Sequence, residues 1–148
     1  SHLAATTLVR LRDRHSAVPF RAANLLYGVF DLSLSPSARS FGDPPVTFGQ
    51  TTLSWMIGHF IGDRDPADPS ISPLYADLVG LCPALFTVGT RDPLLDDTLF
   101  MAARWSPAGN PAVLAVQPGG HHAFDYYDDP PGLAARERMY SFLASFLD

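Results

Sequence analysis

The sequence predicts an α/β protein, in which helices flank a sheet of parallel strands. Three short apolar runs, at 20–30, 83–89 and 112–116, have the length and continuous apolar character of strands buried on both faces. Segments with apolar residues at helical spacing alternate with these runs, which is typical of helices that cross over between parallel strands. We therefore expect residues 1–148 to form part of a single α/β domain.

The remaining elements follow in order along the chain. Apolar residues at helical spacing predict helices at 2–14, 52–61, 93–106 and 133–147. Dense Ser, Pro and Gly on both sides of the second helix predict loops, so residues 33–71 form an excursion between the first two strands. Three strands are few for a sheet whose faces and edges need cover, so we expect further strands from residues outside this sequence.

The composition excludes several classes of protein. Ten Lys and Arg against fifteen Asp and Glu give a formal net charge of -5, so we expect no nucleic-acid partner. No apolar run approaches the roughly 18 residues that cross a bilayer, so we expect no membrane span and a soluble, cytoplasmic protein. The only cysteine, Cys82, lies in an apolar run, where we expect a buried thiol and no internal disulfide.

Two polar residues follow neighbouring predicted strands at equivalent positions. Asp92 comes after the strand at 83–89, and His122 comes after the strand at 112–116. The carboxyl ends of parallel strands meet at one edge of a sheet, and adjacent strands lie about 4.8 Å apart, so these side chains can touch. A carboxylate beside an imidazole fixes its tautomer and stabilises the imidazolium formed when the ring takes a proton from a nucleophile. The pair therefore predicts the acid and the base of a hydrolase.

Each residue has a simpler interpretation when it is taken alone. Asp92 before Pro93 is a good helix start, with Asp as the N-cap and Pro at the first helical position, and capping is compatible with catalysis. An isolated His122 would be an ordinary loop or core histidine, but the paired placement favours a function for both residues. His121 and His122 are adjacent, so their side chains diverge, and no third His or Cys has suitable spacing; we expect no metal site.

The same segments resemble α/β-hydrolase carboxylesterases of the hormone-sensitive lipase family. In that family the acid lies in an Asp-Pro-Leu motif followed by acidic residues, as at 92–97, and the base lies in a His-Gly-Phe or His-Ala-Phe motif, as at 122–124. Residues 72–74 and 81–85 also look like the family's approach to the acid strand, with Cys82 where proline is common. The resemblance spans nearly the whole chain and implies the C-terminal portion of an α/β-hydrolase sheet.

In this family the nucleophilic serine precedes the acid and the base, on a G-x-S-x-G turn. Ser1, His2, Leu3 and Ala4 resemble the last four residues of an elbow that reads like G-D-S-A-G-G-N-L-A, so the resemblance places the nucleophile three positions before Ser1. Ser1 is then not the nucleophile, and His2 is expected to pack or hydrogen-bond at the helix start. The H-G-G-G type oxyanion motif is likewise expected in an N-terminal half, on the same or a separate chain.

The resemblance also implies that the excursion at 33–71 contributes part of a lid over the site. The candidates for substrate contact are Phe48, Trp55, Met56, Phe60 and Phe124. Ordinary helix packing is the favoured explanation for any one of the residues at 55–60, although as a group they would form an apolar wall. Phe124 is expected to pack beneath the histidine more than to touch substrate.

These features together predict a serine carboxylesterase acting on small to medium acyl esters. No cofactor is implied, and the expected partners are an ester substrate and the N-terminal half, with a homo-oligomer left open. A non-catalytic ligand receptor on the same scaffold is an alternative, but retention of Asp92 and His122 speaks against it. An amidase, a peptidase or a lactonase would share the triad, because the fold does not fix the leaving group.

Overall fold

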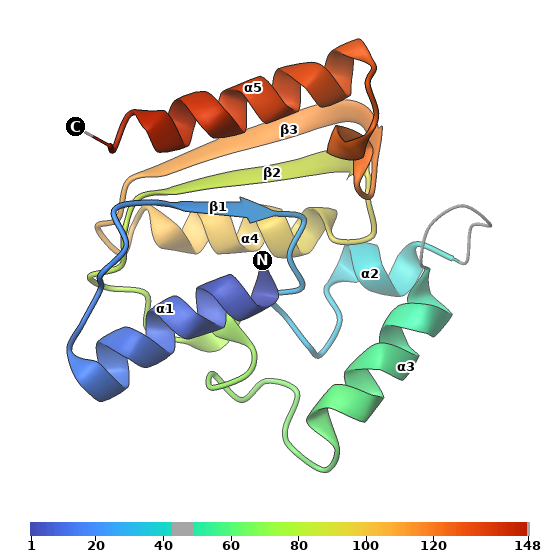
Figure 1. The fold of residues 1–148 in the computed structure, drawn as a ribbon. Coiled ribbons are helices and arrows are strands. Elements are labelled where there is room, and N and C mark those ends of the chain that lie inside the picture. Colours follow the sequence, from blue (N-terminus) through green and yellow to red (C-terminus); the bar gives the residue numbers. More distant parts are fainter. Residues whose placement is uncertain (43–48, 148) are drawn as a thin grey trace.

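The computed structural model describes residues 1–42 and 49–147, and a sheet of three parallel strands runs through its centre (Figure 1). The strands are β1 (Ala23–Leu26), β2 (Ala84–Arg91) and β3 (Ala112–His121), and β2 lies between the other two. Both pairings are parallel. The predicted fold class, a parallel sheet flanked by helices, is confirmed.

The strands differ in length from the prediction, most of all β1 and β3. β1 ends at Leu26 and does not run to residue 30, because Tyr27 adopts a positive φ of 32° that turns the chain out of the strand. β3 continues past residue 116, since its pairing with β2 resumes beyond an irregularity and joins Arg91 to His121. Both differences change which residues stand at the carboxyl edge of the sheet.

Helices cover both faces of the sheet, as Figure 1 shows. α1 (His2–His15) and α4 (Leu95–Trp105) lie on one face, and α5 (Pro130–Ala144) lies on the other. α5 begins earlier than the predicted residue 133, because Asp129 caps it: its carboxylate accepts the Gly132 N–H at 2.9 Å. Short 3₁₀ turns, Pro73–Tyr75 and Phe124–Tyr126, precede β2 and follow β3.

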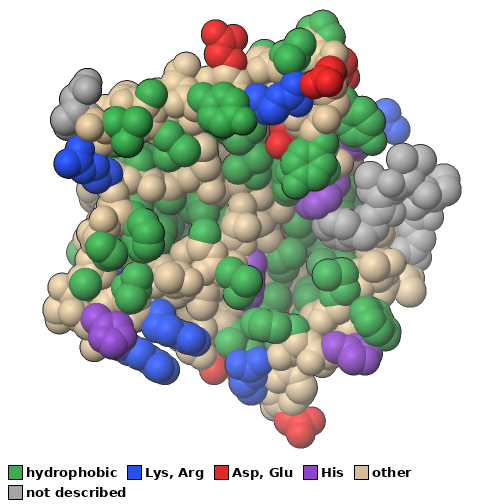
Figure 2. Space-filling view, viewed as in Figure 1, with side chains coloured by type: hydrophobic (Ala, Val, Ile, Leu, Met, Phe, Trp, Pro, Cys, Tyr) green, Lys and Arg blue, Asp and Glu red, His purple; other side chains and the backbone are tan. Residues whose placement is uncertain are grey.

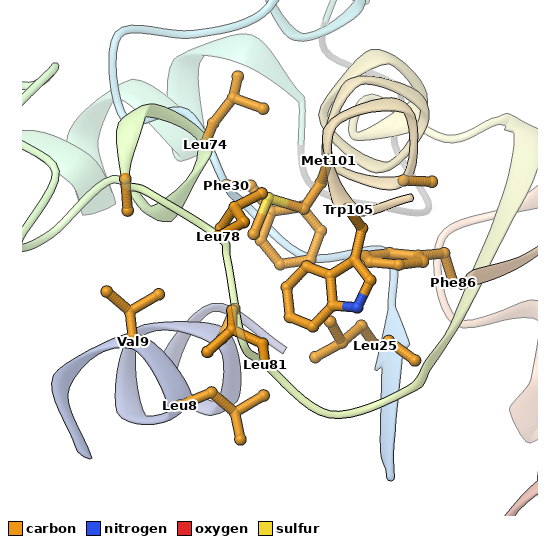
Figure 3. Packing of buried hydrophobic residues seen from close by; sticks show 14 of the residues in the cluster. Leu8, Val9, Leu25, Phe30, Leu74, Leu78, Leu81, Phe86, Met101 and Trp105 are labelled. Atoms are coloured by element: carbon orange, nitrogen blue, oxygen red, sulfur yellow. The ribbon is translucent and has the colours of Figure 1, made fainter. Parts of the chain in front are cut away.

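The largest hydrophobic cluster fills the space between the sheet and the layer of α1 and α4 (Figure 3). Trp105 is fully buried at its centre, edge-to-face with Phe86 at 5.5 Å between ring centroids. The indole N–H of Trp105 donates to the carbonyl of Cys82 at 3.1 Å, so its polar atom is satisfied. The Cys82 thiol is buried as predicted, and burial raises its pKa.

The excursion between β1 and β2 carries two helices, α2 (Pro36–Ser40) and α3 (Gln50–Ile61). The sequence predicts α3 but treats the α2 segment as loop, because Ser and Pro hide any helical period. Contacts with the segment that leads into α4 hold α2 in place: the Ser37 N–H donates to Asp96 at 2.8 Å, and the Ser37 hydroxyl donates to the Pro93 carbonyl at 2.8 Å. Tertiary contacts therefore stabilise a helix that local spacing does not indicate.

α3 presents apolar side chains to the surface. Trp55, Met56 and Phe60 are 63%, 53% and 46% exposed. Leu53 and Ile57, on the same helix, are buried in a cluster with Leu32, Ala38, Ile71 and Leu94. Figure 2 shows hydrophobic side chains over this helix, at the lower right of the molecule. Among the described residues, no helix has both the length and the apolar character needed to cross a bilayer.

Candidate active site

Asp92 is fixed in the turn that follows β2. The residue is 1% exposed, and its Oδ1 accepts the Leu94 N–H at 2.9 Å. α4 itself begins at Leu95, with Leu94 at the N-cap position, so the prediction that Asp92 and Pro93 open the helix is wrong by two residues. The carboxylate closes a local turn before the helix, and this leaves its other oxygen available to a partner from the next strand.

His122 follows the last residue of β3 and lies beside that turn. The backbones of β2 and β3 approach closely here, since a Cβ on Gly89 would lie 2.0 Å from the carbonyl oxygen of Gly120. Ala123 then adopts a left-handed conformation, with φ 60°, which turns the chain back towards the sheet. Two glycines and one left-handed residue therefore set where the imidazole emerges.

The predicted contact between the two residues is present. The Nδ1 atom of His122 lies 3.0 Å from Oδ2 and 3.2 Å from Oδ1 of Asp92. The Asp92 side chain is fully buried, whereas the His122 side chain keeps 20% of its surface exposed. A buried carboxylate on Nδ1 selects the tautomer that carries its proton there, and Nε2 then lies on the opposite side of the ring.

The structure adds two residues that the sequence does not single out. The Tyr27 ring lies against His122, with 4.4 Å between ring centroids, and the Tyr27 hydroxyl donates to Asp125 at 2.9 Å. Tyr27 occupies the same slot after β1 as Asp92 occupies after β2, which is the signal that could have identified it. The expected strand ran through residue 27 and concealed this signal.

An open hollow of about 450 Å³ borders these groups. Its lining comes from the start of α1, the turn after β1 and the loop after β3 and includes Ser1, His2, Tyr27, His122, Asp125 and Tyr126. As expected for the helix start, His2 makes structural contacts: Nε2 lies 2.6 Å from the carbonyl oxygen of Ile71, and its ring meets Phe60 edge-to-face at 5.4 Å. The hollow brings the beginning of this chain next to the candidate base.

The apolar candidates for substrate contact fall into different places. Phe60 contacts His2, which lines the hollow, whereas the Trp55 ring packs on His59 of the same helix at 4.3 Å. Met56 is exposed on α3. Phe124 is 4% exposed and packs in a cluster with Leu85, Ala135 and Met139 on the α5 side of the sheet. Phe48 lies outside the described residues.

Within residues 1–42 and 49–147, no group of three or more His, Cys, Asp or Glu side chains is placed to hold a metal ion. The polar groups at this edge of the sheet include the hydrogen-bonded pair of Asp92 and His122 and their immediate neighbours. Such an arrangement can activate a hydroxyl nucleophile that approaches Nε2 of His122.

A parallel sheet with an Asp and His pair on the turns after two adjacent strands fits the class of α/β hydrolases. A family profile described as the alpha/beta hydrolase fold matches residues 1–126, and the chain belongs to this family.

Two curated relatives and one solved structure show which members of the family the chain is similar to. An acetyl-hydrolase of Streptomyces hygroscopicus is 28% identical over 144 residues, which are 95% of this chain and 48% of that protein. An ethyl acetate hydrolase of Pseudomonas putida is 33% identical over 115 residues, which are 76% of this chain and 36% of that protein. The crystal structure of a hormone-sensitive lipase from a metagenome library matches with a TM-score of 0.91 at 26% identity, covering 99% of this chain and 51% of that one.

The predicted resemblance to hormone-sensitive lipase esterases is thus confirmed. The chain spans about half, or less, of the length of these relatives.

Proposed function

We propose that this chain supplies the base and the orienting acid of a serine carboxylesterase that hydrolyses small to medium acyl esters. The observation that carries the proposal is the contact of 3.0 Å between His122 and the fully buried carboxylate of Asp92. Relatives named as acetyl-hydrolase and ethyl acetate hydrolase support an acyl ester as the substrate class.

In the proposed reaction the serine hydroxyl attacks the ester carbonyl while Nε2 of His122 accepts the hydroxyl proton. His122 then protonates the leaving alcohol, and water repeats the sequence on the acyl-enzyme. Asp92 holds the imidazole in one orientation and stabilises the imidazolium. Backbone N–H groups from residues upstream of this chain would bind the developing oxyanion.

The nucleophile is proposed to stand three positions before Ser1. Ser1 and His2 line the hollow beside His122, and three residues of chain span at most about 11 Å, so a serine there would be within reach of the same hollow. The position of the start of α1, at His2, also supports this placement. A helix that follows a nucleophile directs its first N–H groups towards the reacting oxygen.

The substrate's acyl or alcohol part is proposed to lie against the excursion at 33–71, which would serve as a partial lid. Phe60 supports this placement, because it touches His2 at the rim of the hollow and is partly exposed. The other exposed apolar side chains of α3, Trp55 and Met56, would extend the same apolar surface.

The central test is a pair of substitutions in the complete protein, meaning these residues together with those proposed to precede Ser1. We expect His122→Ala to lower kcat for a short-chain acyl ester by about 10⁴-fold or more, and Asp92→Asn to cause a loss of similar order through the wrong tautomer. His15→Ala, at the end of α1, is the matched control and should retain full activity. Wild-type turnover by the His122 variant would reject the proposal.

Fluorophosphonate labelling followed by peptide mass spectrometry tests the position of the nucleophile. The label should appear on a serine three positions before Ser1, and its rate of attachment should fall in His122→Ala. Labelling of Ser1 itself would contradict the proposed alignment.

A further inference from the structure

Tyr27 has an unusual backbone conformation for its residue type. Its φ of 32° lies in the left-handed region, which a bulky aromatic residue adopts only when its surroundings enforce it. The Tyr27 N–H still donates to the carbonyl of Thr87 in β2 at 2.7 Å, so the turn is anchored to the central strand. This conformation sends the side chain towards the loop that follows β3 and away from the path of the strand.

As a result, the residues that follow the two outer strands, β1 and β3, are in contact beyond the end of β2. The Tyr27 ring packs on the imidazole of His122 with 4.4 Å between centroids and 59° between planes. The hydrogen bond with Asp92 holds one nitrogen of that imidazole. A flat side chain against one face of the imidazole adds a second contact, which limits rotation of the ring about that hydrogen bond.

Asp125 in turn fixes the Tyr27 ring. The phenol donates to Asp125 Oδ1 at 2.9 Å, and Asp125 is 5% exposed. Burial and this carboxylate raise the pKa of Tyr27, so the hydroxyl remains a donor throughout the ordinary pH range. Arg136 of α5 donates to the backbone carbonyls of Asp125 and Tyr127, which ties the loop to a helix on the far face of the sheet.

We propose that Tyr27 is a positioning residue for His122, that its ring restricts the imidazole to the orientation in which Nε2 meets the nucleophile, and that Asp125 holds the Tyr27 ring in place. The inference rests on the proposed function, because it assigns a role in the same reaction. Tyr27 does not exchange protons with the substrate, and its contribution acts entirely through the histidine.

The test compares Tyr27→Leu and Tyr27→Phe in the complete protein. The Leu variant removes the flat ring, and we expect kcat to fall about tenfold to a hundredfold, the loss that a misplaced catalytic group produces, with KM changing little. The Phe variant keeps the ring on His122 and loses only its bond to Asp125, so its kcat should fall clearly less than that of the Leu variant. Since Tyr27 also lines the hollow, a role in substrate binding alone would instead raise KM and leave kcat unchanged.

A spectroscopic readout separates positioning from general loss of structure. The low-field proton resonance of His122 Nδ1, hydrogen-bonded to Asp92, should broaden or disappear in Tyr27→Leu and persist in Tyr27→Phe, while His122→Ala identifies the signal. If the Leu variant does not fold, Tyr27→Met, which is also apolar but has no flat ring, replaces it.

Each result decides between the two proposals. Activity in His122→Ala would reject the proposed function itself. An inactive His122→Ala together with wild-type kcat and an unchanged resonance in Tyr27→Leu or Tyr27→Met would overturn the positioning role alone. A Phe variant impaired as severely as the Leu variant would also overturn it, because the ring would then not be the part that matters.

Discussion

Asp97 is a buried carboxylate of α4, and it holds the chain from Phe30 to Ser35 against this helix. It accepts the N–H groups of Phe30 and Asp31 at 2.7 and 2.8 Å and a hydrogen bond from the Ser35 hydroxyl. Burial raises the pKa of Asp97 to about 6, and the nearby negative charge of Asp31 adds to this rise, although the three hydrogen bonds oppose it. The folded protein therefore binds a proton that the unfolded chain releases at lower pH.

A raised pKa of an acid in the folded state means that its stabilising contribution is complete below the unfolded value of 3.8 and disappears as pH rises through about 6. Relative to Asp97→Asn, the wild type should lose about 2 kcal/mol of unfolding free energy between pH 4 and pH 7. Denaturant titrations across this range measure the difference. The exposed Asp63→Asn serves as control: it keeps Asp97, so its unfolding free energy should fall over this range as that of the wild type does. A difference between wild type and Asp97→Asn that grows with pH would contradict the assignment.

The residues of the candidate site also differ in how readily the sequence alone identifies them. Asp92 and His122 were identifiable because each follows an apolar run and opens a short polar turn. Tyr27 and Asp125 were not, because an aromatic residue after an apolar run reads as more strand and an aspartate in a polar loop has no distinguishing neighbour. The roles proposed for Tyr27 and Asp125 depend on a contact between two chain segments 98 positions apart.

At the scale of elements, the close approach of β2 and β3 sets the separation of Asp92 and His122. A Cβ on Gly89 would meet the backbone of Gly120 at 2.0 to 2.8 Å, closer than real atoms come, so one strand would have to move. The irregular register that follows lets the two strands end in turns on the same side. The close approach of the two strands beside the site thus depends on glycine at position 89.

We expect Gly89→Ala to destabilise the complete protein by about 1–3 kcal/mol and to lower kcat, because the end of β3 that carries His122 must shift. Gly58→Ala makes the same chemical change on the exposed side of α3, where nothing lies within 4 Å of the added carbon. That control should stabilise the protein by up to about 1 kcal/mol without altering kcat. Thermal or urea unfolding together with ester hydrolysis tests both, and equal effects at the two positions would refute the steric argument.

The whole molecule has two edge strands, β1 and β3, in the sheet that the described residues form. The N–H groups of Ala23 and Tyr27 donate towards β2, so the alternation of a parallel ladder turns those of Asn24 and Leu26 away from it. An apolar hollow lies beside this edge of β1, and its lining includes Leu3, Leu8, Phe20 and Ala22. Both features fit the expectation that a further strand covers β1.

Hydrogen exchange in the complete protein tests this expectation. The amides of Asn24 and Leu26 should exchange as slowly as that of Tyr27, which donates to Thr87 and is the internal reference. Fast exchange at residues 24 and 26 beside a protected Tyr27 would mean that β1 remains an edge strand and that no neighbouring strand pairs with it.

The sequence by itself determined the α/β class, the cores of the three strands and the identity of the acid and base candidates. Continuous apolar runs and the polar turns after them are local properties, and these depend on neighbours along the chain. Only the tertiary structure decided where β1 stops, that α2 forms, that α4 begins after Asp92, and that Tyr27 lies on His122. These features depend on hydrogen bonds and ring contacts between distant segments, whose energies can override local propensity.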